Sequence, residues 1–364
     1  MPGSFQQAKS IKKSPKLVVM GDLVLDVITR LPAKIIEIHR GTDTVTALSP
    51  CPGGAAANTA RWLARLGADV HFISRVGKDA LGQALLSDLA AQKIKTYVTQ
   101  DAKHSTGTIV ALVEPDGERS MLIGPAAHFF LDKTDVSLKA FVGAKLVYLS
   151  GYLFFRDRPR RAALHALELA RKNKALIAID PASAGLLAQF GAKRFLRLIL
   201  GTDILLANLE EARLLAQALS PKLRLRHHQT HRKILNAVDE ASQLMEALLE
   251  TFSIVGLKLG SAGCMCAMKI NKTLPESNLS PAVFARKGVW RAHIPAKKIR
   301  VVDSTGCGDA WNAAFLHYLL KGAHLEQAAV EANDLAAQVL RHTGAVSLWE
   351  QLFVKGRVRR SSIS

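Results

Sequence analysis

Short apolar runs alternate with longer amphipathic stretches along most of this chain. A run of about five apolar residues between turn residues is typical of a buried strand, whereas apolar residues three or four positions apart over a longer stretch are typical of a helix. We predict strands at residues 16–20, 70–74, 145–149, 176–179, 204–206 and 254–257. We predict helices at 54–66, 80–92, 159–173, 185–200, 209–219 and 236–251. This alternation indicates a mostly parallel sheet with helices on both faces.

Three segments depart from that alternation. Residues 28–50 lack a long helical pattern and are rich in Thr, Ile and Val. Residues 106–123 have the pattern of a β-hairpin around the turn Pro115-Asp116-Gly117. We expect these two segments to form a small, separate β element over one edge of the large sheet. The stretch at about 220–233 is polar and basic, so we interpret it as an inserted loop.

The composition is that of an ordinary globular protein. Hydrophobic residues make up 49% of the 364 positions and charged residues 22%, which excludes a mainly disordered chain. No apolar run reaches the roughly 18 residues that a membrane span needs, and the first 16 residues lack the apolar stretch of a secretory signal. The sequence contains four cysteines, too few for a disulfide scaffold. We therefore expect a cytoplasmic protein without a membrane partner.

The net charge of +19 is concentrated in three short stretches. These stretches contain basic but no acidic side chains and together hold more than half of the excess positive charge. They are residues 1–16, 222–233 and 355–360. Such charge attracts polyanions without specificity, but no interleaving of basic and aromatic residues accompanies it, so nucleic-acid binding is not expected. We interpret the stretches as solvated. The expected division of the chain is a basic tail, one folded domain and a second basic tail, at 1–15, 16–350 and 351–364.

The string Asp303-Ser304-Thr305-Gly306-Cys307-Gly308-Asp309 is the most informative part of the sequence. We predict that it joins an apolar strand at 299–302 to a helix at 310–320. Glycines let backbone N–H groups approach a ligand, and a helix N-terminus adds positive potential, so the turn suits a phosphate group. Asp309 falls in the first helical turn, where it would face a nucleophile that attacks the phosphate. A carboxylate that only caps the helix is the simpler alternative.

Four motifs occur in an order that identifies a family. DSTGCGDA at 303–310 resembles the C-terminal signature of the ribokinase-like (PfkB) carbohydrate kinases. GGAAAN at 53–58 resembles their N-terminal Gly-Gly-x-x-x-Asn signature, and RVGKDALG at 75–82 continues the match. NLEEA at 208–212 resembles the Asn-x-x-Glu motif of the family, and LGSAG at 259–263 resembles its nucleotide-side turn. The resemblance runs from about Lys16 to about Leu348, which is nearly the whole chain.

The resemblance implies an αβα sandwich with a mostly parallel sheet and a small β-sheet lid. The candidate lid segments are about 28–50 and 104–125. It also implies transfer of the γ-phosphoryl group of ATP to a sugar hydroxyl, with Asp309 as the base that accepts the hydroxyl proton. Phosphoryl transfer depends mostly on positioning and charge stabilisation, for which main-chain amides and one carboxylate are suited. The implied anion hole consists of Gly306, Cys307 and Gly308.

The sugar end of the site is expected around Asp26, in the string GDLVLD. If residues 17–24 form a strand, Asp26 lies at or just past its carboxyl end, where ligands of open α/β sheets bind. The resemblance places a substrate-hydroxyl acceptor there. Gly53 and Gly54 would let the backbone pass close to the sugar, and Asn58 offers both a donor and an acceptor. The alternatives are a solvent-facing loop Asp and a polar residue in the first turn of a helix.

Mg²⁺ is expected to arrive bound to ATP, because it holds few protein ligands and keeps several of its waters. Asn208 and Glu211 resemble the family motif that positions those waters. The alternative is that Glu211 is only an exposed helix residue, as its neighbour Glu210 would also be. The resemblance also implies a monovalent cation such as K⁺, which many members of the family need and hold with backbone carbonyls near the anion hole. The candidate ligands in this sequence are Asp303, Thr305 and Gly344. The nucleotide is expected beside Gly260, Ser261, Gly263 and Asn333.

The leading hypothesis is an ATP-dependent kinase of a small sugar or sugar acid, of the ribokinase, fructokinase or 2-keto-3-deoxygluconate kinase type. A nucleoside kinase of the same fold, of the adenosine or pseudouridine type, is the alternative and would need an aromatic platform for the base. A non-catalytic binding protein is a weaker hypothesis, because Asp309 and its glycines are intact. A homodimer is compatible with the sequence, and Arg156 is interpreted as part of a solvated helix start. The candidate platform residues are Phe129, Phe130, Tyr152 and Phe154.

Overall fold

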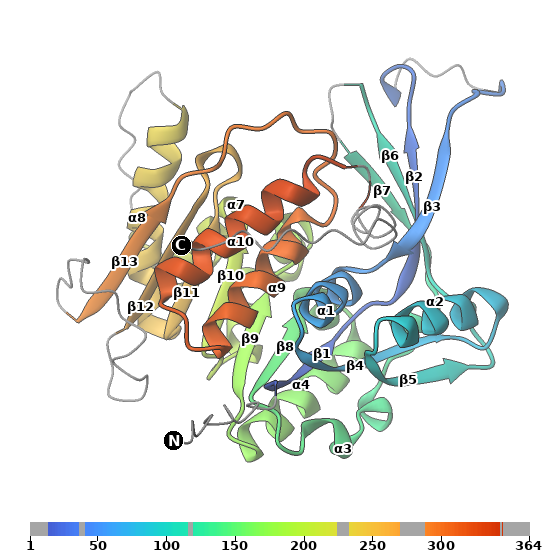
Figure 1. Ribbon diagram of the computed structural model, residues 1–364, viewed down its shortest axis with the longest axis horizontal. Helices are drawn as coiled ribbons and strands as arrows, with labels where there is room; N and C mark the ends of the chain where they lie inside the picture. Colours follow the sequence, from blue (N-terminus) through green and yellow to red (C-terminus); the bar gives the residue numbers. More distant parts are fainter. Residues whose placement is uncertain are drawn as a thin grey trace, which may run out of the picture.

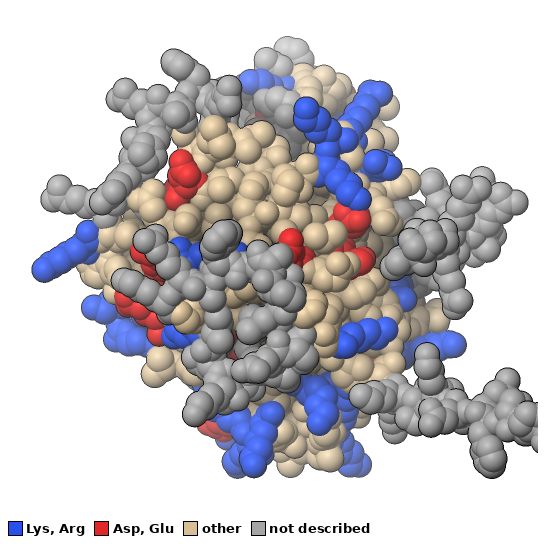
Figure 2. Space-filling view, turned by 60° about the vertical axis from the view of Figure 1, so that its left-hand side comes forward, with Lys and Arg blue, Asp and Glu red and all other residues tan. Residues whose placement is uncertain are grey.

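The computed structural model describes residues 14–35, 41–115, 119–223, 233–269, 288–342 and 344. Nearly all of both predicted tails, most of the predicted insert at 220–233 and the tip of the predicted hairpin therefore lie outside the described residues. No helix within the described ranges is long and apolar enough to cross a membrane. On the face drawn in Figure 2, the described Lys and Arg side chains lie in several separate groups and form no continuous band.

A nine-stranded sheet lies at the centre of the described structure, in the order β13-β12-β11-β10-β9-β8-β1-β4-β5 (Figure 1). The strands from β11 to β5 run parallel, and two antiparallel strands complete the other edge. The parallel strands are β1 (Lys16–Met20), β4 (Asp69–Gly77), β5 (Lys95–Asp101), β8 (Leu146–Ser150), β9 (Leu176–Asp180), β10 (Ile204–Asn208) and β11 (Ile254–Lys258). The antiparallel strands are β12 (Cys264–Lys269) and β13 (Val289–Ile294).

Alternate residues of the central strands face opposite sides of this sheet, and helices cover both sides (Figure 1). Val18 and Met20 of β1 belong to one hydrophobic core, and Leu17 and Val19 to the other. Because both faces are buried, the central strands are continuous apolar runs, which is why the sequence pattern located them. The first core includes α3 (Leu138–Phe141), α4 (Asp157–Lys172), α5 (Ala184–Phe190), α6 (Ala192–Leu198), α7 (Leu209–Leu219) and α8 (Lys233–Thr251). The second includes α1 (Ala55–Arg65), α2 (Ala80–Ala91), α9 (Cys307–Leu320) and α10 (Leu325–Val339).

A smaller, four-stranded sheet projects from the large one, in the order β3-β2-β6-β7 (Figure 1). Its middle pair β2 and β6 is parallel, and the two outer pairs are antiparallel. The predicted hairpin is confirmed in its two described strands, and a separate β element is present. Of the segment predicted at 28–50, only the two ends belong to strands, because the described residues 31–35 and 41–47 are irregular. The strands are β2 (Val24–Arg30), β3 (Leu48–Gly53), β6 (Thr108–Val113) and β7 (Arg119–Ile123).

The RVGKDALG string anchors the chain that enters this smaller sheet. Asp79 caps α2 by accepting a hydrogen bond from the Gly82 N–H, at 2.7 Å. The same carboxylate accepts hydrogen bonds from the Thr106 N–H at 2.7 Å and the Thr106 hydroxyl at 2.6 Å. A Cβ on Gly77 would lie 2.4 Å from the Thr106 nitrogen, so only glycine allows this close approach. Strand β6 begins two residues after the anchored Thr106.

Two expectations about strands are wrong. The segment at 299–302 is irregular, and Val301 and Val302 are exposed instead of buried in a sheet. The N–H of Val302 donates to the carbonyl oxygen of Leu340 at 2.8 Å, so the segment is held by the end of α10. The strand predicted at 16–20 is confirmed as β1, but Asp26 does not follow the end of that strand and lies inside β2 of the smaller sheet. A short apolar run indicates burial, and burial alone does not distinguish a strand from an irregular connection.

Two helix boundaries also differ, and three strands were not predicted. Gly191, with φ 94°, divides the helix expected at 185–200 into α5 and α6. The helix expected at 310–320 begins at Cys307, so it includes part of the glycine-rich turn. The unpredicted strands are β5, β12 and β13. β5 and β13 are the edge strands of the sheet, where polar positions interrupt the apolar pattern, whereas β12 is an apolar run between β13 and β11 that the sequence prediction missed.

Candidate active site

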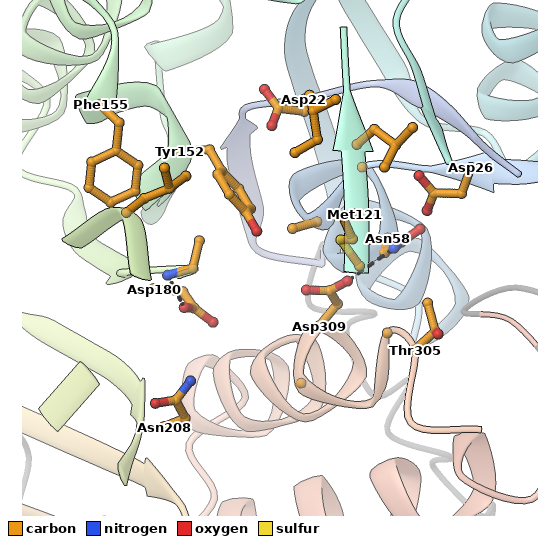
Figure 3. A pocket seen from close by; sticks show the side chains of 18 of the residues that line it. Asp22, Asp26, Asn58, Met121, Tyr152, Phe155, Asp180, Asn208, Thr305 and Asp309 are labelled. Atoms are coloured by element: carbon orange, nitrogen blue, oxygen red, sulfur yellow. Dashed lines mark hydrogen bonds between the residues drawn. The ribbon is translucent and has the colours of Figure 1, made fainter. Parts of the chain in front are cut away.

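A cavity of about 640 Å³ lies where the carboxyl ends of the parallel strands meet the smaller sheet and the N-terminus of α9. This is the edge where open α/β sheets bind ligands. In Figure 3, Asp180 and Asn208 from the large sheet, Asp26 from the smaller sheet and Asp309 from α9 surround the same space. The predicted site residues that line the cavity are Asp26, Gly54, Asn58, Asn208, Glu211, Gly260, Thr305, Gly306, Cys307, Gly308 and Asp309. Those that do not line it are Gly53, Ser261, Gly263, Asp303, Asn333 and Gly344.

The glycine-rich turn places the N-terminus of α9 at the cavity. Gly306 precedes the helix in the left-handed conformation, with φ 72° and ψ 1°, which favours glycine. Helix α9 then runs for 14 residues from Cys307. The N–H groups of a first helical turn have no acceptors within the helix, and the aligned peptide dipoles add positive potential there. This conformation and this potential suit an anion at the turn from Gly306 to Gly308, although the Cys307 N–H already donates to the Ser304 carbonyl oxygen at 3.4 Å.

Asp309 lies in that first turn, deep in the cavity. Its Oδ2 accepts a hydrogen bond from Nδ2 of Asn58 in α1, at 3.0 Å. Burial raises the pKa of Asp309 to about 7, an effect that Asp180 reinforces and that Asn58 and Lys258 oppose. The carboxylate therefore bonds to a neighbouring helix and carries a pKa near neutrality, which a plain capping residue would not need.

Asn58 is held from behind by a buried arginine. Arg61, with 1% of its surface exposed, donates from Nη1 to Oδ1 of Asn58 at 3.2 Å and from Nε to Asp88 at 2.8 Å. Arginine only donates hydrogen bonds, so this contact fixes the Asn58 amide with its nitrogen toward Asp309. The sequence analysis missed Arg61, although its spacing of three residues from Asn58 places both on one side of the helix.

Asp26 reaches the cavity from the middle of β2. Burial raises its pKa to about 6, while Arg61 opposes that rise and Asp22 adds to it. A Cβ on Gly53 would lie 2.2 Å from the Asp26 carboxyl carbon, so Gly53 leaves the space that this carboxylate occupies. Gly54 lines the cavity with φ 96°, a conformation that favours glycine. Asp26 is thus neither in a loop nor directed to bulk solvent.

Aromatic side chains line another part of the cavity. Phe129 and Tyr152 line it, as predicted for a platform, and so does the unpredicted Phe155. The other two candidates do not, because Phe130 stacks on His104 and Phe154 is buried against Phe195. Arg156, interpreted from the sequence as part of a solvated helix start, lines the cavity with its guanidinium 3.5 Å from the centre of the Phe129 ring.

Asn208 and Glu211 cap the start of α7 reciprocally. The Asn208 Oδ1 accepts from the Glu211 N–H at 2.8 Å, and the Glu211 Oε2 accepts from the Asn208 N–H at 2.9 Å. Glu211 is 2% exposed, so the alternative of an exposed helix position is wrong for Glu211, while Glu210 is exposed. Burial, reinforced by Asp180, raises the pKa of Glu211 to about 7.

The predicted nucleotide residues divide into two groups. Gly260, Ser261 and Gly263 form the turn after β11, and Gly260 lines the cavity. Asn333 does not line the cavity, because its side chain is engaged elsewhere: Oδ1 accepts from Trp311 Nε1 at 3.0 Å and Nδ2 donates to the Ile294 carbonyl oxygen at 3.1 Å. These bonds join α10 to α9 and to the end of β13.

Asp303 is buried beside the glycine-rich turn. Its Oδ1 accepts from the N–H and hydroxyl of Thr305, at 2.9 and 2.8 Å, and its Oδ2 accepts from the Gly344 N–H at 2.8 Å. The Arg30 guanidinium lies 3.9 Å from the same Oδ2. The Asp303 side chain therefore ties its own backbone to those of Thr305 and Gly344, the other two residues predicted as ligands of a monovalent cation.

Comparison with known proteins shows which family has this sequence and fold. The model of the pfkB family carbohydrate kinases matches residues 14–352. The chain belongs to this family. A fructokinase of Klebsiella pneumoniae is 26% identical over 330 residues, which cover 88% of this chain and 90% of the relative. Among solved structures, an adenosine kinase of Sinorhizobium meliloti has a TM-score of 0.73 at 23% identity, over 91% of this chain and 95% of the other. An Escherichia coli protein provisionally called ribokinase II, in complex with ATP and Mg²⁺, has a TM-score of 0.70 at 21% identity over 91% and 94% of the two chains.

Two expectations from the sequence are thereby confirmed. The ribokinase-like αβα sandwich with a smaller sheet is the fold of these neighbours. As a member of the pfkB family, the protein is a phosphotransferase whose acceptor is an alcohol group.

In this pfkB-family kinase, Cys307 is expected to be the most reactive thiol. It is half-buried, lines the cavity and begins α9, and a helix N-terminus favours the reactive thiolate form. Burial instead raises the pKa of Cys51 to about 12, and Cys264 and Cys266 are buried. We expect a small alkylating reagent to inactivate the enzyme and Mg-ATP to slow the inactivation. Mass spectrometry should find the label on Cys307, and equally fast inactivation of Cys307→Ala would contradict this assignment.

Proposed function

We propose that the protein transfers the γ-phosphoryl group of ATP to a hydroxyl group of a small sugar or sugar acid, with Asp309 as the base. One observation carries the proposal: the Asp309 carboxylate lies in the cavity at the N-terminus of α9, held by Asn58. Asp26 lines the same cavity from the smaller sheet (Figure 3). A phosphate-binding helix end, a carboxylate base and a second carboxylate for hydroxyl groups are thus combined in one cavity.

In the proposed step, the sugar hydroxyl donates a hydrogen bond to Asp309 and its oxygen attacks the γ-phosphorus. The hydroxyl proton passes to Asp309 while the bond to the leaving oxygen of ADP breaks. A pKa of about 7, raised by burial, suits a base that works near neutral pH. The N–H groups at Gly306, Cys307 and Gly308 are placed to stabilise the charge on the phosphoryl oxygens.

The sugar is proposed to bind between Asp26 and Asn58. A buried carboxylate can accept hydrogen bonds from two neighbouring hydroxyls, and such charged hydrogen bonds are stronger than neutral ones. A carboxamide has two donor and two acceptor positions, so Asn58 can hold Asp309 and Arg61 and still contact a hydroxyl. The smaller sheet adds Ile109, Met121 and Ile123 to the cavity wall, and we propose that it acts as a lid that excludes water.

Mg²⁺ is proposed to enter with ATP. The described residues contain no cluster of three or more His, Cys, Asp or Glu side chains that could hold a metal ion by itself, which fits an ion that keeps its waters and phosphate ligands. Asn208 and Glu211 line the cavity, and a hydrated cation beside them would favour the charged form of Glu211. When bound, Mg²⁺ would neutralise charge on the transferring phosphoryl group.

The remaining predicted ligands have supporting roles in this proposal. A monovalent cation such as K⁺ is proposed at backbone carbonyls of Asp303, Thr305 and Gly344, whose positions the Asp303 carboxylate fixes. The nucleotide is proposed beside Gly260 and the turn that follows it. Because the Asn333 amide is already bonded to Trp311 and Ile294, we propose that it positions α10 rather than contacting adenine.

A nucleoside acceptor is the second candidate, and the aromatic wall favours it. Phe129, Tyr152 and Phe155 line the cavity and offer surfaces on which a base could stack. The Arg156 guanidinium over Phe129 instead suits an acceptor that carries a carboxylate. The two features predict different substrates for the same cavity.

A substrate panel tests the proposed function. ADP release should be measured with pentoses, hexoses, 2-keto-3-deoxy acids and nucleosides, each in potassium and in choline chloride. We expect one sugar or sugar-acid class to have a kcat/KM at least about 100-fold above the nucleosides, since a site built for hydroxyls discriminates strongly against poor matches. A preference for nucleosides would replace the sugar proposal, and the same slow ADP release with every acceptor and with water would contradict both.

A further inference from the structure

Lys258, which no sequence motif had indicated, ends β11 at the wall of the cavity. Its ammonium donates to Oδ2 of Asp180 at 2.7 Å and to Oδ1 of Asn312 at 3.2 Å. The Asn312 amide in turn donates to Asp180 at 2.5 Å and to the Tyr148 hydroxyl at 3.3 Å. A buried ion pair needs such additional hydrogen bonds to offset the loss of water. Two large-sheet strands and α9 therefore fix the position of the ammonium.

The ammonium lies beside the proposed anion hole. The Lys258 Nζ is 3.8 Å from the position that a Cβ on Gly308 would occupy. Asn312, which accepts from the ammonium, follows Asp309 by three residues on α9. The same helix thus carries the proposed base, the proposed anion hole and a partner of Lys258. An anion bound at the first turn of α9 would come within reach of Nζ.

The charge of the cavity lining also favours a cation at this place when a polyphosphate binds. Among the described lining residues, five are acidic and only Lys258 and Arg156 are Lys or Arg. Arg156 stacks on Phe129 and acts on the pKa of Asp22 and His128, whereas Lys258 acts on the pKa of Asp309. A polyphosphate that enters beside Asp180, Glu211 and Asp309 would otherwise meet three carboxylates. Of the two Lys and Arg side chains among the described lining residues, Lys258 is the one beside these carboxylates, where its charge offsets their repulsion of the phosphates.

We propose that Lys258 is a catalytic residue that binds the γ-phosphoryl oxygens and stabilises their charge during transfer, with Asp180 and Asn312 as its positioning residues. The inference rests on the proposed function. An ammonium has three N–H donors, and two of them have the partners named above, so a third can reach a phosphoryl oxygen. Such a preorganised cation acts where charge develops and does not itself change protonation.

The protonated form is the one that the network favours. Burial lowers the pKa of Lys258, but Asp180 and Glu211 more than compensate and leave the pKa above its ordinary value. The ammonium therefore stays charged at neutral pH and serves as an electrostatic contact rather than as an acid or base.

The alternative is that Lys258 only keeps Asp180 neutralised, and two variants distinguish these roles. Lys258→Met leaves Asp180 buried without a counter-ion, so its loss of activity would have two explanations. Lys258→Met/Asp180→Asn has no buried charge at either position and keeps an acceptor for the Ala182 N–H that Asp180 now binds. The matched control is Lys269→Met, since Lys269 donates to the Glu250 carbonyl oxygen at the opposite end of the sheet.

For the double variant we expect kcat to fall about 100-fold, as for the loss of one preorganised donor, while the KM of the acceptor changes less than threefold. Calorimetry should show that a non-hydrolysable ATP analogue loses its affinity advantage over ADP, because Lys258 would contact only the γ-phosphate. Lys258→Arg should retain that advantage. Recovery of kcat to within about threefold in the double variant, or an unchanged preference for the ATP analogue in it, would overturn the proposal.

If the Met variants do not fold, as judged by circular dichroism, the Lys258→Arg variant still tests whether Lys258 contacts the γ-phosphate. Retained preference for the ATP analogue supports the proposal, and its loss contradicts a charge contact with the γ-phosphate. The binding measurement needs no turnover, so its outcome is independent of whether Asp309 is the base.

Discussion

Replacing Asp309 by Asn is expected to reduce kcat by 10²- to 10⁴-fold, which corresponds to roughly 3–5 kcal/mol of barrier. Asn has nearly the same shape but does not accept the proton that the acceptor hydroxyl loses. ATP binding should persist, because the proposed anion hole consists of main-chain N–H groups at the start of α9. Steady-state kcat and calorimetric ATP affinity should be measured together on protein whose fold is confirmed by circular dichroism.

The control for this variant is Asp239→Asn, which makes the same change at an exposed carboxylate of α8 that does not line the cavity and should leave kcat unchanged. An Asp309→Asn protein with more than about a tenth of the wild-type kcat would contradict the role of base, since loss of a general base is rarely so mild. A protein that is inactive only because ATP no longer binds would indicate a structural role for this carboxylate.

The pH profile gives a second measurement of the same role. A base must be ionised, so raising its pKa moves the loss of activity to higher pH. Because burial raises the pKa of Asp309 to about 7 and that of Asp26 to about 6, kcat/KM should fall about tenfold per pH unit between these two values and more steeply below them. In Asp309→Asn this limb should move toward pH 6, where Asp26 titrates with a pKa of about 6. An unchanged acid limb in the variant would mean that another group controls it.

The sequence predicted the parts of the fold that depend on local pattern. Strands such as β1 and β11, buried on both faces, are uninterrupted apolar runs, and the glycine-rich turn carries its own conformational requirement at Gly306. Eleven of the predicted site residues line one cavity, and of these Asn208, Glu211 and Gly260 do so because they follow the carboxyl ends of parallel strands, which meet at one edge. The glycine-rich turn reaches the same edge from an irregular segment, and Gly54 and Asn58 reach it after β3 of the smaller sheet. Asp26 reaches the same cavity by a route that the sequence did not indicate, through a strand of the smaller sheet.

The residues that the sequence did not reveal act through contacts between distant segments. Asp180 and Lys258 are 78 positions apart, and each ends an apolar strand with a single charged residue that no motif distinguishes. Arg61 resembles a surface helix residue until α1 packs against the rest of the fold. Its pairing with Asp88 and Asn58 exists only in the tertiary structure. A buried charge is recognisable from its partners, and those partners are not neighbours in the sequence.

The second large effect is expected at Asp26. Asp26→Ala should reduce kcat/KM for the acceptor by about 100-fold or more, because a carboxylate that accepts two hydroxyl hydrogen bonds contributes roughly 1.5–3 kcal/mol for each. The loss should be mainly in the KM of the acceptor, while the affinity for ATP stays within about threefold. Initial rates over a range of acceptor concentrations, with ATP affinity from calorimetry, separate the two quantities.

Gly53→Ala provides an independent test that leaves the carboxylate in the chain. The added Cβ would lie 2.2 Å from the carboxyl carbon of Asp26, so the carboxylate must move away from its present position. Gly53 does not line the cavity itself, so a direct effect on the acceptor is not expected. The KM of the acceptor should therefore rise in Gly53→Ala as it does in Asp26→Ala, and the double variant should be little worse than Asp26→Ala alone, since both changes remove one interaction. Fully additive losses in the double variant would show that Gly53 acts separately, and a wild-type KM in Asp26→Ala would exclude Asp26 from acceptor binding.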